Sequence, residues 1–533
     1  MTDLDLLFLH RHVDRLLAPW DRTGTPGVTL GIVRDNHLVL HRSAGMASLE
    51  LGVPVGPDTT FRIASVSKQF TCAAILLLAA EGRLSIDDDV REHIPALPDL
   101  GHRITLSHLM HNTSGIRDML EIMRCGGADL SQPCTPQDLL DGVCRQRALN
   151  FAPGTRYLYS NSNFMLLGRI VEQVSGEALR AFLDRRIFAP LGMAATRHVP
   201  STSEPVPGLA SGYLAAPGGG WQRAMHGFPL HGEGGLVSSV PDLALWHANF
   251  ASPRVGGGKL AEALTTQTPF ANGQPNAYAR GLGVRCYRGQ RIVEHGGLWP
   301  GFKTAFLRLP DYAAAVICIT NNATVDPHAL AQAAVDVMLD GDATAPKPPP
   351  ALPHAALAGL AGRWLDRAAG ATADIAVAAD GTVTVTTYGV PFVAAPAEDG
   401  RLAAAASTSA FALRLSADRD VLEVERDAGV RSDYRRVAEG AALPEGLDGV
   451  YENPDTAATW SIGAGEVRVI GPLVRGGAWS AEPIEADVIR IVAPGNLYRS
   501  WFDVRVLRDA SGQISGLRAD GGRAKGLVFT RCG

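Results

Sequence analysis

The sequence predicts a multidomain protein of the α/β plus all-β class: an α/β domain over residues 1–340, then two small antiparallel β-barrel modules. Three observations predict this. A chain of 533 residues is too long for one hydrophobic core. Residues 341–354 are rich in proline, which favours neither helix nor central strand, so we expect a semi-rigid linker there. After this stretch, alternating strands and turns replace the mixed helical and strand patterns.

Strand patterns lie at both ends of the first part of the chain, and helical patterns lie between and after them. The strand-like runs are 29–33, 38–41, 291–294 and 314–319, and the helical patterns are 70–81, 158–175 and 327–339. The first two strands flank a four-residue turn and predict a hairpin. This order predicts a sheet flanked by helices.

The second part of the chain carries a weak internal repeat. Each half opens on a glycine and an aromatic residue and closes on an aromatic residue and arginine, at 362–364 and 434–436, then at 449–451 and 529–531. We therefore expect two barrels, at 355–440 and 441–533. The alternative on the same pattern is one continuous β-sandwich.

Composition excludes several classes of partner. A formal net charge of -5 gives no reason to expect nucleic acid or an anionic membrane. No run is long and apolar enough to span a bilayer, and the first residues carry acids where a secretory signal carries basic residues. The seven cysteines show no metal-ligand spacing and suit reduced thiols. We expect a cytoplasmic protein with no metal and no cofactor, and the sequence leaves a homodimer open.

Ser65 and Lys68 form the strongest chemical signal. A serine hydroxyl needs a partner to take its proton, and an amine does so once burial or a nearby cation lowers its pKa. Arginine cannot serve, yet the chain has only five lysines among 49 basic residues, so a lysine beside an apolar helix favours a proton acceptor. The alternative is a serine at a helix N-terminus followed by a solvated lysine.

Two further elements support this chemistry. Tyr159 and Asn161 precede a helix, and the Tyr159 phenol near Lys68 would relay the serine proton to the leaving group. His295, Gly296 and Gly297 end a strand, and the glycines would let a substrate backbone lie along its edge. Taken singly, they are equally consistent with a packing tyrosine and a hairpin turn.

Together, the three motifs at residues 65–68, 159–161 and 295–297 resemble those of the penicillin-recognising (serine β-lactamase-like) hydrolases, which include class C β-lactamases, esterases and DD-peptidases. The resemblance spans roughly residues 25–340. It implies an antiparallel sheet with flanking helices and a helical subdomain. Residues 65–73 and 125–129, with the two β modules, are similar to the bacterial D-aminopeptidases, which release N-terminal D-residues such as D-alanine from amides and short peptides.

The resemblance implies a role for each matched residue. Ser65 is the nucleophile, Lys68 its proton acceptor, and Tyr159 assists proton transfer. Asn161 contacts the substrate, His295, Gly296 and Gly297 form the binding strand, and the backbone N–H groups of Ser65 and Leu298 form the oxyanion hole.

The resemblance also implies a loop at 471–479 of the second barrel that reaches the active site. The family carries an acid in this loop that meets the substrate ammonium, and here that place falls on Gly477. Without it the chain lacks the most obvious recognition of a free amine. Glu482, Asp118 or Glu233 could take over this contact, or the substrate differs.

The function expected is therefore a serine hydrolase that forms an acyl-enzyme, of D-aminopeptidase-like specificity, acting on a small amide, peptide or ester. The same fold and motifs also fit an esterase or β-lactamase-like hydrolase. A non-catalytic penicillin-recognition sensor is the remaining alternative, and the intact Ser65, Lys68 and Tyr159 argue against it.

Overall fold

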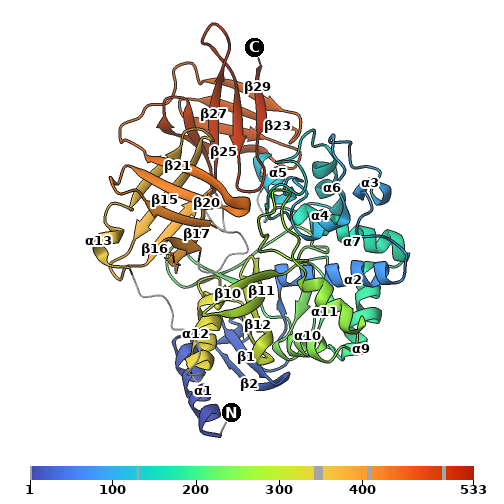
Figure 1. The fold of residues 1–533 in the computed structure, drawn as a ribbon. Helices are drawn as coiled ribbons and strands as arrows, with labels where there is room; N and C mark the ends of the chain where they lie inside the picture. Colours follow the sequence, from blue (N-terminus) through green and yellow to red (C-terminus); the bar gives the residue numbers. More distant parts are fainter. Residues whose placement is uncertain are drawn as a thin grey trace.

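The computed structural model describes residues 3–128, 131–340, 352–397, 399–404, 411–494 and 500–532. In Figure 1, a mixed α/β part forms the bottom and the right-hand side of the molecule, the first β-barrel lies at the left, and the second β-barrel lies at the top. Most of the predicted linker, residues 341–351, lies outside the described residues.

The α/β part is built on one antiparallel six-stranded sheet in the order β10-β11-β12-β13-β1-β2. The strands are β10 (Gly283–Tyr287), β11 (Gln290–Trp299), β12 (Phe302–Leu309), β13 (Ala314–Thr320), β1 (Val28–Arg34) and β2 (His37–Ala44). β1 pairs with β13, from Val28 opposite Thr320 to Val33 opposite Ala315, so the beginning and the end of this part meet in the middle of the sheet. The predicted hairpin and strands are confirmed.

Helices cover both faces of the sheet. α1 (Asp3–Leu17) and α12 (Pro327–Asp340) pack on one face, and α10 (Val240–Ala251) packs on the other. Every residue of β13 is buried, which explains its continuous apolar sequence in place of an alternating one.

A helical region lies to one side of the sheet (Figure 1). Its helices are α2 (Lys68–Ala80), α3 (Val90–His93), α4 (Leu106–Met110), α5 (Met119–Cys125), α6 (Pro136–Cys144), α7 (Asn161–Ser175), α8 (Leu179–Leu183), α9 (Ala189–Leu191) and α11 (Gly257–Thr265). α2 and α7 pack against each other at its centre, where most of the residues of both helices are buried. Both begin at the active site described below.

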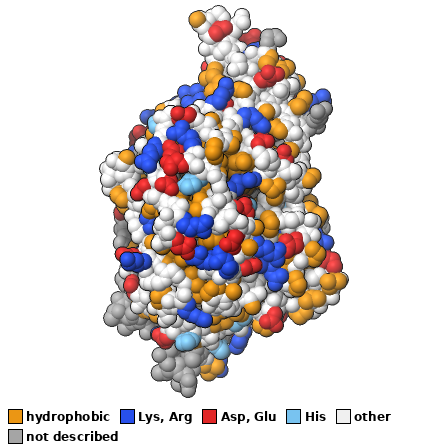
Figure 2. Space-filling view, turned by 90° about the vertical axis from the view of Figure 1, so that its right-hand side faces the viewer, with side chains coloured by type: hydrophobic (Ala, Val, Ile, Leu, Met, Phe, Trp, Pro, Cys, Tyr) orange, Lys and Arg blue, Asp and Glu red, His pale blue; other side chains and the backbone are white. Residues whose placement is uncertain are grey.

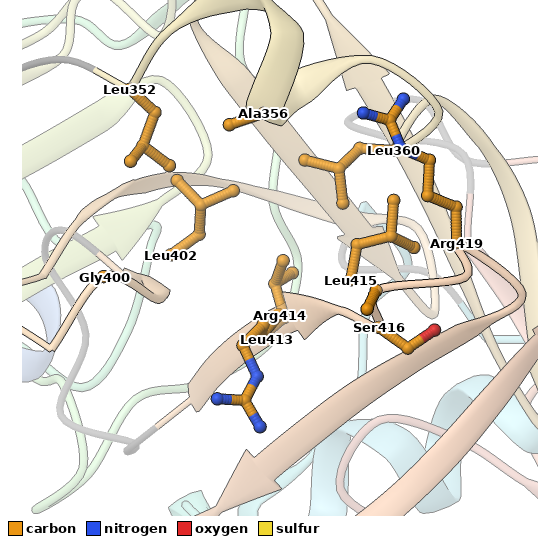
Figure 3. Close-up of a pocket in the computed structure, with 11 residues that line it drawn as sticks. Leu352, Ala356, Leu360, Gly400, Leu402, Leu413, Arg414, Leu415, Ser416 and Arg419 are labelled. Carbon is orange, nitrogen blue, oxygen red and sulfur yellow. The ribbon is translucent and has the colours of Figure 1, made fainter.

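The first barrel is a closed ring of eight antiparallel strands. They are β14 (Gly362–Asp366), β15 (Ala371–Val377), β16 (Val383–Thr387), β17 (Val390–Pro396), β18 (Leu402–Ala404), β19 (Phe411–Leu415), β20 (Val421–Arg426) and β21 (Val430–Arg436). A cavity of about 310 Å³ opens at one end, beside α13 (His354–Leu357). Its lining is mostly leucine and alanine, and it contains none of the residues of the three sequence motifs (Figure 3).

The second barrel repeats this architecture. Its strands are β22 (Gly449–Asn453), β23 (Ala458–Gly463), β24 (Glu466–Ile470), β25 (Arg475–Glu485), β26 (Val488–Ala493), β27 (Ser500–Arg508), β28 (Ile514–Asp520) and β29 (Leu527–Cys532). Stacked aromatic rings fill its core, with Trp460 and Phe529 at 4.0 Å between centroids. Two closed barrels confirm the predicted repeat and exclude the single β-sandwich.

The charged side chains on the surface and the state of the cysteines are those of an ordinary globular protein. On the face drawn in Figure 2, acidic and basic side chains are interspersed. Within the described ranges, no helix has the length and apolarity to cross a membrane. The same residues contain no group of three or more His, Cys, Asp or Glu side chains placed to hold a metal ion. All seven cysteines are free thiols.

Candidate active site

Ser65 lies in a short 3-10 turn, Ala64–Ser67, that leads directly into α2. Its side chain is only partly buried, so a substrate can reach it. Ala64 immediately before it has φ of 47°, a left-handed conformation that is uncommon for alanine and that typically occurs at functional sites. This sharp turn directs Ser65 Oγ toward the first residue of the helix, Lys68.

Lys68 is fully buried and surrounded by hydrogen-bond partners. Its Nζ lies 3.1 Å from Ser65 Oγ, 2.9 Å from Asn161 Oδ1 and 2.6 Å from the backbone oxygen of Glu233. A neutral amine has two hydrogens and one lone pair. It therefore donates to the two oxygens that only accept, and its lone pair accepts the Ser65 proton.

Burial is the main cause that lowers the pKa of Lys68, to about 7. The carboxylates of Glu233 and Asp118 act in the opposite direction, and the Arg523 guanidinium lowers this pKa further. Near neutral pH a substantial share of the Lys68 amines is therefore neutral and in contact with the serine as a base.

Tyr159 contacts both of these residues. Its hydroxyl hydrogen-bonds Ser65, and Lys68 Nζ lies 4.8 Å from the centre of its ring. Desolvation raises the pKa of the Tyr159 phenol above its ordinary value, and the bond to Ser65 offsets this only in part. Near neutral pH the phenol keeps its proton, so its geometry suits a proton donor or relay, and Lys68 suits the base.

Asn161 is the first residue of α7 and is held at both ends of its amide. Its Oδ1 accepts from Lys68, and its Nδ2 donates to Asp118 Oδ2 at 2.9 Å. The Asn161 backbone N–H donates to the same Asp118 oxygen at 2.6 Å. The structure thus gives Asn161 a positioning contact to Lys68 in addition to the substrate contact that the resemblance implied.

The segment His295–Leu298 lies in the second half of β11, beside the 3-10 turn that carries Ser65. Pairing of β11 with β10 stops at Glu294 opposite Gly283, whereas pairing with β12 continues to Trp299. One edge of the strand therefore has no strand neighbour among the described residues. A Cβ on Gly297 would lie 2.2 Å from the Ile63 oxygen, so glycine is needed for this close approach.

His295 and Leu298 point in different directions. His295 is buried, and its Nε2 lies 3.0 Å from the Tyr278 hydroxyl while its Nδ1 lies 2.6 Å from the Gly296 oxygen. Burial lowers the pKa of His295 to about 3, so the ring is neutral: Nδ1–H donates to Gly296 and Nε2 accepts from Tyr278. The Leu298 side chain is 61% exposed and contributes an apolar surface beside the site.

The second barrel does contact the site, through a segment that the sequence analysis did not single out. Residues 521–526, between β28 and β29, place Arg523 3.6 Å from Asp118 and 5.9 Å from the Tyr159 ring centre. Part of the expected loop, Gly471 and Pro472, lies against Gly126 instead.

Gly477 occupies a strand. It belongs to β25 and pairs with Val469 of β24, in place of the loop conformation expected for it. Of the alternative carboxylates, Glu482 also lies in β25, opposite Arg490. Asp118 and Glu233 do lie beside Lys68 but are buried, and Asp118 already binds Asn161.

Three features place the chain in the penicillin-recognising class of proteins. They are the antiparallel sheet, the helical region beside it, and the contacts among Ser65, Lys68 and Tyr159. The chain belongs to the beta-lactamase family, whose family model matches residues 9–338. It is 30% identical over 345 residues to a D-aminopeptidase of Cereibacter sphaeroides, covering 65% of this chain but only 64% of that protein. A D-aminopeptidase of Brucella canis is 30% identical over 374 residues, 69% of this chain and 68% of the relative.

Solved structures share the fold at lower identity. The octameric penicillin-binding protein homologue from Pyrococcus abyssi aligns with a TM-score of 0.57 and 22% identity, over 88% of this chain and 98% of that one. At this identity the likeness shows the fold alone.

Proposed function

We propose that this chain is a D-aminopeptidase-like serine hydrolase that releases N-terminal D-residues from amides and short peptides through an acyl-enzyme. The observation that supports the hydrolase is the contact between Ser65 Oγ and a buried lysine whose pKa lies near 7. The substrate class rests on the D-aminopeptidases that the chain resembles.

The catalytic cycle follows from these positions. Lys68 accepts the Ser65 proton as Oγ attacks the carbonyl carbon, and the backbone N–H groups of Ser65 and Leu298 stabilise the oxyanion. Collapse of the tetrahedral intermediate expels the amine, which takes the proton through Tyr159 or directly from Lys68. A water then loses its proton to the same base and hydrolyses the ester on Ser65.

An esterase or β-lactamase-like activity is the second candidate, and Arg523 is the observation that favours it. Gly477, at the position where the resemblance implied an acid, supplies no carboxylate for a substrate ammonium. The barrel segment that does contact the site brings the cation Arg523, which repels an ammonium. We therefore expect weak discrimination between free amines and their ester or N-acyl analogues.

One panel of substrates tests both candidates. The parent and Ser65→Ala are assayed on D- and L-alanine p-nitroanilide, p-nitrophenyl acetate and a chromogenic cephalosporin. Cleavage of the D-alanine anilide that Ser65→Ala abolishes supports the first candidate. Cleavage of only the ester or cephalosporin supports the second, and a Ser65→Ala variant within tenfold of the parent contradicts the nucleophile assignment.

We further propose that the protein acts in the cytoplasm on small diffusible substrates. Seven free thiols, two of them more than half buried in the helical region at Cys72 and Cys125, suit a reducing compartment. Size-exclusion chromatography with light scattering tests for the homodimer that the sequence left open.

A further inference from the structure

The connection between β28 and β29 brings the second barrel onto the N-terminal end of α5. The backbone N–H of Asp118 donates to the Arg523 oxygen at 3.1 Å, and Asn150 Nδ2 donates to the same oxygen at 3.2 Å. The guanidinium lies 3.6 Å from Asp118 Oδ2 and 3.8 Å from Glu121 Oε1, and its side chain is only 26% exposed. Arg523 is thus held by its backbone and ion-paired by its side chain.

We propose that Arg523 is a positioning residue which keeps Lys68 in its neutral, proton-accepting form by balancing the charge of Asp118. This inference rests on the proposed function, because it assigns a role in the chemistry of Ser65. Arg523 acts through Asp118, which lies between its guanidinium and Asn161.

A continuous set of contacts joins the two cations. Asp118 Oδ2 faces Arg523 on one side and accepts both N–H groups of Asn161 on the other. Asn161 Oδ1 then accepts from Lys68. Asp118 is fully buried, so its charge is poorly screened and acts strongly on whichever cation lies near it.

The charges around Lys68 decide the direction of the effect. The titratable groups that face it are Asp118 from the start of α5, Glu233 from the segment before β9 (Leu236–Ser238), Arg523 from the second barrel, Cys72 on α2, Tyr159 and His295. Burial keeps Cys72, Tyr159 and His295 uncharged near neutral pH. The two carboxylates favour the ammonium form of Lys68, and Arg523 is the cation that opposes them.

Arg523→Gln removes this cation and leaves the segment attached. The backbone bond from Asp118 remains, as does the bond from the Lys525 N–H to Asn150 Oδ1 at 2.8 Å. Arg117 also donates to the Lys525 oxygen at 3.0 Å. The variant is therefore expected to fold, and circular dichroism and the thermal midpoint check this.

The test measures how the reactivity of Ser65 depends on pH. A fluorophosphonate serves as the probe: Ser65 Oγ attacks phosphorus, Lys68 takes the proton and fluoride leaves, and intact-protein mass spectrometry follows the adduct. In the parent we expect the rate to rise with pH through a midpoint near 7. In Arg523→Gln we expect the midpoint to rise by about one pH unit, the size of effect that one nearby charge produces.

Such a shift lowers the labelling rate about fivefold at pH 7, and the rate recovers to about nine-tenths of the parental value by about pH 9. Arg523→Lys retains the charge and is expected to restore most of the parental profile. Arg147→Gln is the matched control: Arg147 also bridges the two domains, 2.6 Å from Asp455, but it is not among the charged groups that mainly shift the pKa of Lys68, and its profile should equal the parent's.

An unchanged midpoint in Arg523→Gln overturns the proposal, and so does an equal loss at every pH, which indicates a purely structural role. An equal shift in Arg147→Gln also overturns it, because the interface as a whole then sets the midpoint. Failure of the proposed function gives a different result: the parent itself leaves Ser65 unlabelled at every pH.

Discussion

Among the lysines in the described part of the chain, Lys68 is the one that is fully buried beside a serine and two acidic side chains. Arginine is the common base of this sequence and would keep the same positive charge. It would keep its proton under all conditions, however, because its pKa stays high even when it is buried. The distinction between a charge and a base can therefore be made with one substitution.

We expect Lys68→Arg to lower kcat/KM at least about 10²-fold, nearly as much as Lys68→Ala, because a general base contributes roughly 10²–10⁴-fold. Steady-state kinetics on the best substrate of the panel measures this. Lys259→Arg, on the exposed surface of α11, is the matched control and should change nothing. An arginine variant with more than about a tenth of parental activity would mean that Lys68 acts only as a fixed charge.

At the residue scale, the sequence predicts the site residues that belong to recognisable motifs and misses those that lie outside any motif. Ser65 and Lys68 are one helical turn apart, so their contact follows from local geometry. Arg523 lies in a glycine-rich turn with no apolar period or motif around it. Its contact with Asp118 depends on how a barrel docks, which no local pattern encodes.

β11 is the element that holds the most demanding backbone geometry of the site. The two consecutive glycines predicted that the strand ends at this point, but the strand continues through them to Trp299. Tertiary pairing with β12 overrides the low strand propensity of glycine here. The close approach of Gly297 to Ile63 explains why a residue without a side chain stands in the middle of a strand.

Gly297→Ala is therefore expected to displace β11 from the nucleophile turn. The added Cβ would meet a backbone oxygen at 2.2 Å, which cannot move as a side chain can. We expect a loss of roughly 1–3 kcal/mol in stability from this overpacking and a fall in kcat. Thermal unfolding and kinetics measure both effects.

Gly258→Ala provides the comparison, since its added Cβ meets nothing within 4 Å. It should leave activity unchanged and, because Gly258 lies in α11, raise stability by at most about 1 kcal/mol. Equal behaviour of the two variants would contradict the role of Gly297 as a close-approach position.

The whole molecule is joined by a buried polar interface between the helical region and the second barrel. Arg117, which is 2% exposed, donates to Asp455 Oδ2 at 2.9 Å, to the Lys525 oxygen and to Gln146. Trp460 of the barrel core donates to the Cys125 oxygen at the end of α5. The proline-rich linker and the change to alternating strands and turns predicted separate modules, and the structure has separate modules. Their docking brings together residues more than 300 positions apart along the chain.

Asp455→Ala should destabilise this interface strongly, by about 3–5 kcal/mol, because it leaves the Arg117 charge buried without its carboxylate. Urea unfolding followed by tryptophan fluorescence measures the change. Asp487→Ala removes a comparable but exposed ion pair with Arg508 and should cost at most about 1 kcal/mol. Similar losses in the two variants would contradict the buried interface as the element that joins the domains.

The reach of the second barrel into the active site also sets an order of events during synthesis. Arg523 follows Ser65 by roughly 450 residues, which at about 5–20 residues per second corresponds to about 20–90 s of translation. Until then, Asp118 lacks its partner and Lys68 is biased toward the ammonium form. On the ribosome, the nascent chain would carry Ser65 and Lys68 from early on, and under the role proposed for Arg523 it would become fully reactive only when its last barrel closes.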